Sequence, residues 1–447
     1  MADIPPPSRR PNVIWVFGDQ HRAQALGCAG DPNLHTPHID RLAVEGLSFN
    51  GVSGCPLSCP YRGSLLTSRY PHECVPGHED PLPDGMPTIA TAFNAAGYRT
   101  AWFGKWHVAG HHERDSRAGT AIVPRRLRGD FQQWLGYENN NSQWDCHVHG
   151  HDAGGAEIPL SRLPTFETDA LTDLLLRYVE DRAADGEPFF AALSVQPPHD
   201  PYVCPAEWMG RHNPANIQLR PNVPHIPRVE SQARRELAGY YGMIENLDHN
   251  LGRVRDALWR LGLIENTHLI FFSDHGDMHG SHGQLRKTNP YEESIRVPCI
   301  FGGTMPRYTA HTGRTPALMN HVDMAPTTLG LCGIAKPTGM RGTDYSGLRL
   351  LHHERPAIPD SAFLQLVRPT LHGNSTDRPW RGVVTTDGWK YACLEHQPWL
   401  LFNLNEDPYE QANLAHNTAF AGPRKRLHDR LAQWISDTGD NFPLPSL

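Results

Sequence analysis

The sequence lacks several features that would place it in common protein classes. Its 447 residues contain no run of about eighteen or more apolar residues, which argues against a membrane-spanning helix. Residues 1–10 lack the apolar core of a secretory signal. We therefore expect no membrane association, and a cytoplasmic protein, or a periplasmic or secreted one if a signal peptide has been removed.

A basic charge excess and a regular cysteine pattern are also absent. Lys and Arg number 41 against 48 Asp and Glu, so the net charge is −7 and the basic field that binds nucleic acid is missing. The nine cysteines are odd in number and irregularly spaced, which argues against a disulfide framework. Histidine, by contrast, is abundant at 27 residues, which indicates polar or metal chemistry.

The order of predicted elements indicates the fold class. Short apolar and β-branched runs predict buried strands at residues 13–17, 98–103, 189–195 and 268–272. Helical patterns lie between them, at residues 88–96, 168–185 and 233–261. Alternating strands and helices predict an α/β fold with a mostly parallel central sheet flanked by helices.

The pattern changes near residue 345. Residues 383–385 and 390–393 read as two strands, and Asp387-Gly388 between them is typical of a hairpin turn. A last helix is predicted at residues 423–437. We therefore expect a large domain over residues 1–345 and a smaller C-terminal α+β subdomain over residues 346–447.

Polar side chains follow all four predicted strands of the large domain. Any one of them alone could be a capping aspartate or a surface histidine. Four together favour a functional site, because ligands of open α/β sheets bind at the carboxyl ends of the strands. The residues concerned are Asp19, Lys105, His107, His199, Asp274 and His275.

The side-chain types at these positions suit a cation that faces an anionic substrate. Asp19 and Asp274, with His275 or Gln20, offer oxygen and imidazole donors for calcium, magnesium or manganese rather than for a structural zinc. Several further side chains could donate hydrogen bonds to the oxygens of a sulfuryl or phosphoryl group. They are Arg62, Lys105, His107, His199 and Lys287.

Residues 58–69 read Ser-Cys-Pro-Tyr-Arg-Gly-Ser-Leu-Leu-Thr-Ser-Arg, and residues 64–67 suggest the first turn of a helix. This stretch, together with residues 104–107, 198–202, 240–246, 273–276, Lys287 and 291–294, matches the motifs of a known family. On these motifs, residues 11–447 resemble a type I sulfatase of the alkaline-phosphatase superfamily. The nucleophile motif of that family is Cys or Ser, any residue, Pro, any residue, Arg, then a small pair and Leu-Leu-Thr-Gly-Arg.

The register of this motif implies that the nucleophile is Ser58 and not Cys59. The family's nucleophile stands two positions before the proline and four before the arginine, as Ser58 does before Pro60 and Arg62. We expect Cys55 and Cys59 to be small packed residues.

Serine at position 58 departs from the cysteine that most of the family carries and oxidises to formylglycine. Three interpretations remain open. Ser58 is an engineered replacement that traps substrate, a natural serine oxidised to formylglycine, or an unmodified nucleophile like the serine of alkaline phosphatase. The resemblance also implies a formylglycine-generating enzyme as the partner for maturation.

The metal site departs from the family as well, since Asp19-Gln20 replaces a pair of aspartates and His275 replaces an asparagine. The latter is also similar to phosphonate monoester hydrolases and related phosphodiesterases. Hydrolysis of a phosphonate monoester or phosphodiester therefore remains an alternative to sulfate ester hydrolysis, and a non-catalytic binder of sulfated ligands is a third. Calcium is the expected ion, with manganese or magnesium as alternatives.

The resemblance assigns a role to each candidate residue. Arg62 braces the nucleophile, and Lys105 and Lys287 bind the oxyanion oxygens. His107 deprotonates the second hydroxyl of the formylglycine hydrate, and His199 protonates the leaving oxygen. One divalent ion is held by Asp19, Gln20, Ser58, Asp274 and His275.

The expected substrate is a small sulfated saccharide. Residues 134–147 follow the Lys105 strand and are rich in Trp, Tyr and Asn, which suit a sugar ring, although a structural loop with amides would have the same composition. We place this segment in a long polar insertion. An oligomer is possible.

Overall fold

The computed structural model describes residues 10–303, 310–371 and 376–447. Within these ranges, no helix combines the length and apolar character needed to cross a membrane. All nine cysteines lie within the described residues and all are free, as the irregular cysteine spacing predicts.

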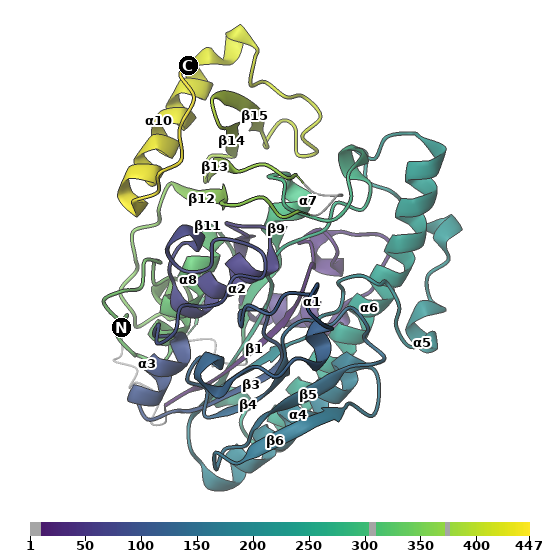
Figure 1. Cartoon of the computed structure of the whole chain (residues 1–447), viewed down its shortest axis with the longest axis vertical. Helices are drawn as coiled ribbons and strands as arrows, with labels where there is room; N and C mark the ends of the chain where they lie inside the picture. The colour runs from purple at the N-terminus through teal and green to yellow at the C-terminus, as the bar shows by residue number, and fades with distance from the viewer. Residues whose placement is uncertain (1–9, 304–309, 372–375) are drawn as a thin grey trace.

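A large mixed sheet forms the centre of the molecule (Figure 1). Its strand order is β11-β2-β10-β8-β1-β7-β3-β4-β5-β6, with β9 paired to β2, and β8, β1, β7, β3 and β4 run parallel to one another. The strands are β1 (Asn12–Gly18), β2 (Leu47–Val52), β3 (Arg99–Lys105), β4 (Gln133–Tyr137), β5 (His147–His151), β6 (Glu157–Arg162), β7 (Phe189–Ser194), β8 (Thr267–Ser273), β9 (Arg296–Val297), β10 (Cys299–Gly302) and β11 (Gly313–Asn320). The expected α/β fold with a mostly parallel central sheet is confirmed.

The central strand β1 shows why this sheet needs helices on both faces. Its side chains alternate, so that Trp15 and Phe17 enter one apolar cluster and Ile14 and Val16 enter another on the opposite face. All four are fully buried. A parallel strand that is apolar on both faces is stable only when both faces are covered.

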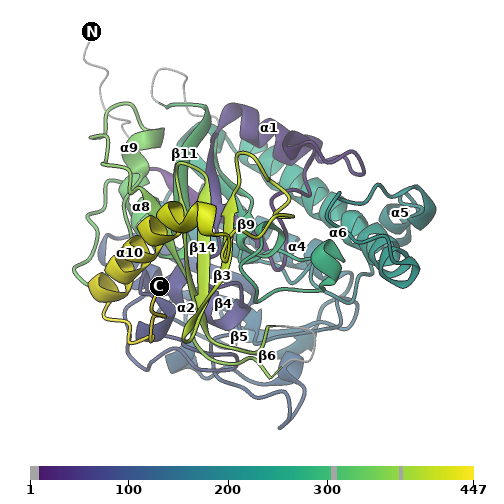
Figure 2. The ribbon, with the colours of Figure 1, turned by 90° about the horizontal axis from the view of Figure 1, so that it is seen from above.

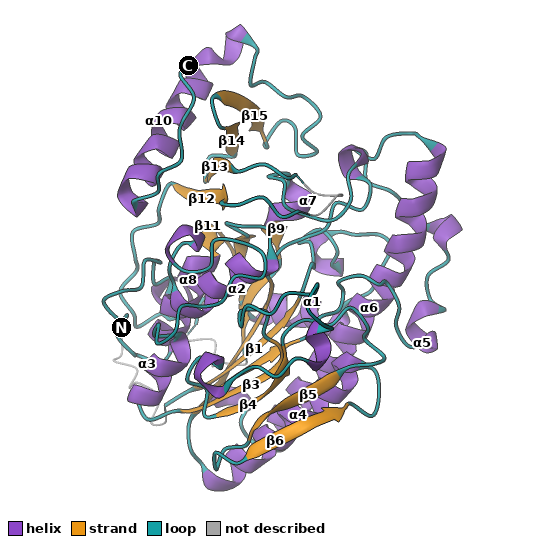
Figure 3. Ribbon diagram, in the orientation of Figure 1, coloured by secondary structure: helices purple, strands orange, loops and turns teal. Residues whose placement is uncertain are grey.

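Two layers of helices provide that cover (Figure 3). α2, α3 and α8 contribute to the cluster around Trp15, and α1, α4 and α6 to the cluster around Ile14. The α-helices of the large domain are α1 (Pro37–Glu45), α2 (Ser58–Thr67), α3 (Ile89–Ala95), α4 (Glu167–Asp185), α5 (Ala206–Met209), α6 (Pro227–Arg260), α7 (Glu292–Ile295) and α8 (His321–Leu331). The short helix α9 (Ser346–Arg349) follows.

A smaller antiparallel sheet lies beyond the large one in the chain and packs against α10 (Ala421–Thr438). In Figure 2 the yellow helix α10 crosses the strands of this sheet. The strands are β12 (Ser361–Leu366), β13 (Trp380–Thr385), β14 (Trp389–Leu394) and β15 (Gln397–Asn403), in that order. The predicted hairpin corresponds to β13 and β14, and the predicted last helix to α10. The boundary near residue 345 stays a prediction.

The smaller sheet also contacts the large domain directly. The indole nitrogen of Trp380 donates to the carbonyl oxygen of Thr288, with 2.8 Å between the two atoms. Lys390 of β14 donates to the carboxylate of Glu292, the first residue of α7, at 3.0 Å. These two contacts fix the start of α7 and the loop before it against the smaller sheet.

Three elements differ from expectation, namely α6, β4 and α2, and the start of α2 belongs to the site below. α6 begins at Pro227, six positions before the predicted start at residue 233, because Pro227 occupies the first helical turn, where its missing N–H needs no partner. Residues 134–137 belong to the segment that we expect in a polar insertion, but with Gln133 they form β4, paired in parallel with β3. The buried side chain of Trp134 lies next to Trp102 of β3 in this pairing.

Candidate active site

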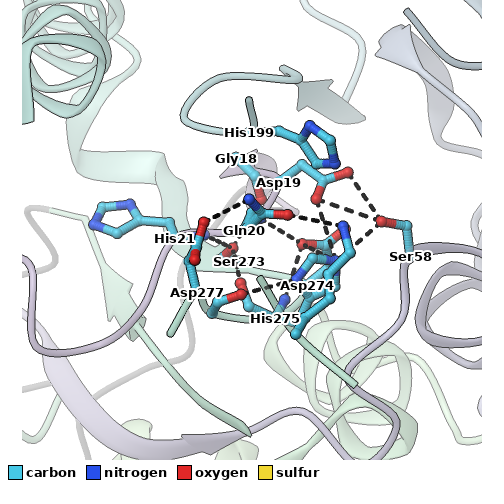
Figure 4. A network of polar contacts seen from close by, with 12 residues as sticks. Gly18, Asp19, Gln20, His21, Ser58, His199, Ser273, Asp274, His275 and Asp277 are labelled. Atoms are coloured by element: carbon cyan, nitrogen blue, oxygen red, sulfur yellow. Dashed lines mark hydrogen bonds and ion pairs between the residues drawn. The ribbon is translucent and has the colours of Figure 1, made fainter. Parts of the chain in front are cut away.

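Four neighbouring strands of the large sheet end at one site. In the order β8-β1-β7-β3, each strand is followed by, or ends in, one or two of the predicted site residues. Figure 4 shows Asp19, Ser58, His199, Asp274 and His275 converging there, although their chain positions are far apart. The prediction that the strand ends meet is thus realised in the fold.

Ser58 occupies the first position of α2, and its side chain faces the strand ends. Its Oγ lies 3.1 Å from Oδ2 of Asp19 and 3.0 Å from Nε2 of His275. At the N-terminus of a helix, free N–H groups and the helix dipole favour negative charge, which suits a nucleophilic oxygen. Residues 64–67 form the end of this helix and not its start, because Pro60 is accommodated in the first turn, where no N–H is required.

The neighbouring Cys59 is buried and does not line the cavity that Ser58 faces. Burial raises the pKa of its thiol to about 12, so the nucleophilic thiolate is suppressed at neutral pH. Cys55 is also fully buried. Both thiols therefore lie where packed residues are expected.

Asp19, Asp274 and His275 form a compact buried group. One ligand atom from each lies within 4.8 Å of the others. Nε2 of His275 is 3.3 Å from Oδ1 of Asp19 and 3.7 Å from Oδ1 of Asp274. The other ring nitrogen, Nδ1, is 3.2 Å from the carbonyl oxygen of Gly276, which favours the tautomer with Nε2 free to bind an ion.

The charges around this group shift its pKa values in opposite directions. Burial alone would raise the pKa of Asp19, but Lys105 and Lys287 outweigh burial and hold this pKa well below its usual value. Burial and the charge of Asp19 raise the pKa of Asp274. Oδ2 of Asp274 makes no hydrogen bond to any described residue, as expected of an atom that an ion would contact.

Arg62 lies about one turn after Ser58 on α2 and is fully buried. One guanidinium nitrogen donates to the carbonyl oxygen of Lys105 at 2.9 Å and to Oγ of Ser194 at 2.8 Å. The other lies 3.6 Å from Asp19 and 3.4 Å from Asp274. The guanidinium is thus fixed against β3 and β7 and holds both carboxylates in place.

Lys105 and Lys287 approach the site from two directions. The ammonium of Lys105 contacts Oδ2 of Asp19 directly, and burial lowers its pKa. The ammonium of Lys287 donates to Oε1 of Gln20 at 2.8 Å. Both are buried, so their charges are little screened by water.

Gln20 takes part in a hydrogen-bond network that was not foreseen. Its amide nitrogen donates to Asp277 at 2.6 Å and to Asp200 at 3.2 Å, while its oxygen accepts from Lys287. The role of Gln20 as a metal ligand stays a prediction, because in this structure the amide oxygen is used by the lysine. Asp277 and Asp200 belong to the same strand-end motifs as the predicted site residues. Their closeness in sequence to His275 and His199 was the signal that could have identified them as part of the site.

His107 and His199 line the cavity over Ser58. Nδ1 of His199 donates to the carbonyl oxygen of Asp200 at 2.7 Å, and burial together with Lys287 lowers its pKa to about 4. Burial and Lys105 hold the pKa of His107 well below its usual value. His107 adopts a φ of 60°, a conformation that non-glycine residues take at some cost and mostly at functional sites.

The cavity has a volume of about 410 Å³. Asn139 and Asn141 from the segment after β4 lie on its rim, whereas Asn140 is turned away and its backbone N–H donates to Gln196 at 3.0 Å. The lining residues are Gln20, Leu57, Ser58, His78, His107, Glu113, Asn139, Asn141, His199, Asp200, Arg286, Lys287 and Leu371.

Comparisons with known proteins agree with this geometry. The family model "Sulfatase" matches residues 11–334, and the model "N-sulphoglucosamine sulphohydrolase, C-terminal" matches residues 280–437. An ulvan-active sulfatase of Formosa agariphila is 33% identical over 439 residues, covering 97% of this chain and 82% of the relative. An endo-4-O-sulfatase of Bacteroides thetaiotaomicron is 31% identical over 392 residues, covering 76% and 73%.

A solved structure from a study of glycosaminoglycan metabolism in Bacteroides thetaiotaomicron superimposes with a TM-score of 0.82 at 26% identity, covering 97% of each chain. The family models, the relatives and this shared fold give the same result. The chain belongs to the sulfatase family of the alkaline-phosphatase superfamily, and it is a sulfuric ester hydrolase.

Proposed function

We propose that this sulfatase hydrolyses a sulfate ester of a carbohydrate, with the nucleophile at position 58 and a divalent cation held at the strand ends. The observation that carries the proposal is the position of Ser58. Its Oγ lies within 3.1 Å of Asp19 and 3.0 Å of His275, on the side of α2 that faces the cavity.

The chemistry of the donors supports the cation. Asp19, Asp274 and His275 would hold it, with Ser58 adjacent, and two carboxylates with one imidazole suit calcium, manganese or magnesium. The buried Oδ2 of Asp274 makes no hydrogen bond to any described residue, although it lies 3.4 Å from the guanidinium of Arg62, so it can also contact an ion. Such a cation supplies positive charge that acidifies a hydroxyl nucleophile and polarises the sulfuryl group. Calcium is our first choice.

The cationic side chains act on the sulfuryl oxygens. Lys105 and Lys287 provide two ammonium groups in a region largely excluded from water, where charge stabilisation is strong. Arg62 keeps the two carboxylates and the start of α2 in position through its contacts with Lys105 and Ser194.

The two histidines carry the proton transfers in this proposal. His199 donates a proton to the leaving oxygen, since the hydrogen bond from Nδ1 to Asp200 fixes the ring orientation. The anionic substrate favours the protonated ring that this role requires. His107 accepts a proton from the hydroxyl that releases sulfate.

The chemical form of residue 58 determines whether the enzyme can release sulfate and complete more than one turnover. A formylglycine hydrate at this position would supply a second hydroxyl for sulfate release. The gene-encoded serine leaves the same three interpretations. Ser58 is an engineered replacement, a natural serine that a generating enzyme oxidises to formylglycine, or an unmodified nucleophile. A peptide mass for residue 58 separates the oxidised from the unmodified forms.

The rim of the cavity supports a saccharide substrate. Asn139, Asn141 and Glu113 present amide and carboxylate groups that pair well with sugar hydroxyls. The names of the relatives, an ulvan-active sulfatase and an endo-4-O-sulfatase, point the same way.

The test is a screen of the purified protein, with the state of residue 58 measured by mass, against sulfated saccharides and aryl sulfates. Phosphonate monoesters and phosphodiesters belong in the same screen, because the neutral Gln20 and His275 near the nucleophile favour them as the second candidate. Higher kcat/KM for sulfated saccharides supports the proposal. Higher kcat/KM for the phosphorus esters would replace sulfate ester hydrolysis with phosphorus ester hydrolysis as the function. A protein whose residue 58 is oxidised, and which binds sulfated ligands without turning them over, would be a non-catalytic binder.

A further inference from the structure

A second group of side chains of types that bind metal ions lies at the start of α2. Cys59, His78 and His107 each offer a ligand atom, and these atoms lie within 4.8 Å of one another. We propose that these three residues bind a zinc ion at the edge of the active-site cavity, which His78 and His107 line and behind which Cys59 is buried. The proposal concerns a different site from the carboxylate group at Asp19 and does not depend on the proposed substrate.

The surroundings of Cys59 and His78 resemble the outer layer of a metal site. Sγ of Cys59 is 3.9 Å from Nδ1 of His78, and the backbone N–H of Glu79 donates to the sulfur at 3.3 Å. Oε1 of Glu79 lies 3.7 Å from Nε2 of His78. A carboxylate behind a ligating histidine orients the ring and increases its basicity, and an N–H donor stabilises a metal-bound thiolate.

His107 supplies an independent observation. The residue is 5% exposed, and its Nδ1 makes no hydrogen bond to any part of the chain that the structure describes. A buried polar atom without a partner costs free energy, so its presence calls for a ligand. The rings of His78 and His107 are 5.6 Å apart and perpendicular, close enough to share one ion after a small movement.

The donor types select zinc. Thiolate sulfur and imidazole nitrogen are the preferred ligands of Zn²⁺, whereas calcium and magnesium prefer the oxygens offered by Asp19 and Asp274. Three protein ligands leave a fourth position of the tetrahedron open, and His78 and His107 both line the cavity. On binding, the thiol of Cys59 releases its proton to solvent and a sulfur–zinc bond forms. While it binds the zinc ion, His107 cannot accept the proton that releases sulfate, so zinc should inhibit hydrolysis. This consequence rests on the proposed function.

Cobalt(II) is the probe that separates the two metal sites, because only a cobalt–thiolate bond gives an intense near-ultraviolet charge-transfer band. We expect this band in the unmodified chain, in Asp274→Asn, and in Cys74→Ser, a control that removes another buried thiol near α2. The band should be lost in Cys59→Ser. Zinc should displace the cobalt, and the zinc affinity of His78→Ala should fall by more than about 100-fold, since losing a direct ligand exceeds the effect of losing an outer one.

Three results would overturn the site. One is the absence of the charge-transfer band from the unmodified chain under cobalt excess. Another is a band that persists in Cys59→Ser, which would place the thiolate ligand elsewhere. If Cys59→Ser does not fold, His78→Ala decides the matter, because His78 is partly exposed and its replacement leaves the core intact. Unchanged zinc affinity in that variant also refutes the proposal.

Discussion

Nε2 of His275 lies 3.0 Å from Oγ of Ser58, although 217 positions separate the two residues in the chain. One follows β8 and the other begins α2. Their contact places the proposed nucleophile directly beside the proposed metal ligands.

Asp274→Asn should weaken binding of the divalent cation at the strand ends by at least about 10-fold, because a neutral amide replaces a buried anionic ligand. Calorimetric titration of calcium and manganese into the metal-free protein measures this loss. Asp248→Asn is the matched control, since Asp248 is also a buried carboxyl but accepts hydrogen bonds from His38 and Ile39. Equal affinity in both variants would remove Asp274 from the metal site.

The chain as written, with serine at position 58, should bind sulfate esters and hydrolyse them poorly. In the proposed mechanism, binding depends on Arg62, Lys105 and Lys287, which are unchanged, whereas release depends on a second hydroxyl that serine lacks. Ser58→Cys, coexpressed with a formylglycine-generating enzyme, should restore multiple turnover. Equilibrium binding and steady-state kinetics measure the two properties separately.

Two outcomes contradict this expectation. Rapid turnover by a protein whose residue 58 is unmodified serine by mass would favour a mechanism like that of alkaline phosphatase. A residue 58 that is two hydrogens lighter than serine would show natural conversion to formylglycine.

His199→Ala, in an active form of the protein, should slow esters with poor leaving groups by about 100-fold or more, the range typical of general acid catalysis. Activated aryl sulfates should be much less affected, because their leaving oxygen needs little protonation. A plot of kcat against leaving-group pKa for both proteins gives the comparison. Parallel losses across the series would mean that His199 does not donate the proton.

Glu138 makes the folded state sensitive to pH. Burial raises the pKa of its carboxyl to about 7, so the folded state holds this proton more tightly than the unfolded state does. The contribution of the protonated Glu138 carboxyl to the free energy of unfolding is therefore fully present below pH about 4.5. It is lost as the pH rises to about 7. The loss is roughly 3 kcal/mol, since one pKa unit corresponds to about 1.4 kcal/mol.

Glu138→Gln should remove this part of the pH dependence. Oε1 accepts from the backbone N–H of Ala109 at 2.9 Å, and the amide oxygen of glutamine can take over that bond. Denaturant unfolding at pH 5 and pH 8 compares the two proteins, with the exposed Glu265→Gln as control. If Glu138→Gln loses as much stability between these pH values as the unmodified chain, Glu138 is not the source.

Much of the site was predictable because its residues follow easily recognised strands. Residues 13–17 and 268–272 are apolar, β-branched or aromatic runs, so the positions of Asp19 and Asp274 followed from local pattern. The parallel order of the strands then brings their ends together.

Other features depend on contacts that no local pattern encodes. β4 contains only five residues, Gln-Trp-Leu-Gly-Tyr, and none is β-branched, so it forms a strand because β3 offers a partner. The start of α2 is masked by Pro60 and Gly63, which usually mark the absence of a helix. The hydrogen bonds of Gln20 to Asp277 and Lys287 span more than 250 positions and appear only in the folded chain.

The hydrogen bond from Trp380 to Thr288 affects how this protein can be recombined with its relatives. Thr288 adjoins Lys287, and Leu371, between β12 and β13, lies on the cavity wall. A chimera that exchanges the C-terminal part would thus replace both Leu371 on the cavity wall and Trp380, the hydrogen-bond donor to Thr288 beside the proposed substrate-binding Lys287. We therefore expect the substrate preference of such a chimera to depend partly on the origin of its C-terminal part.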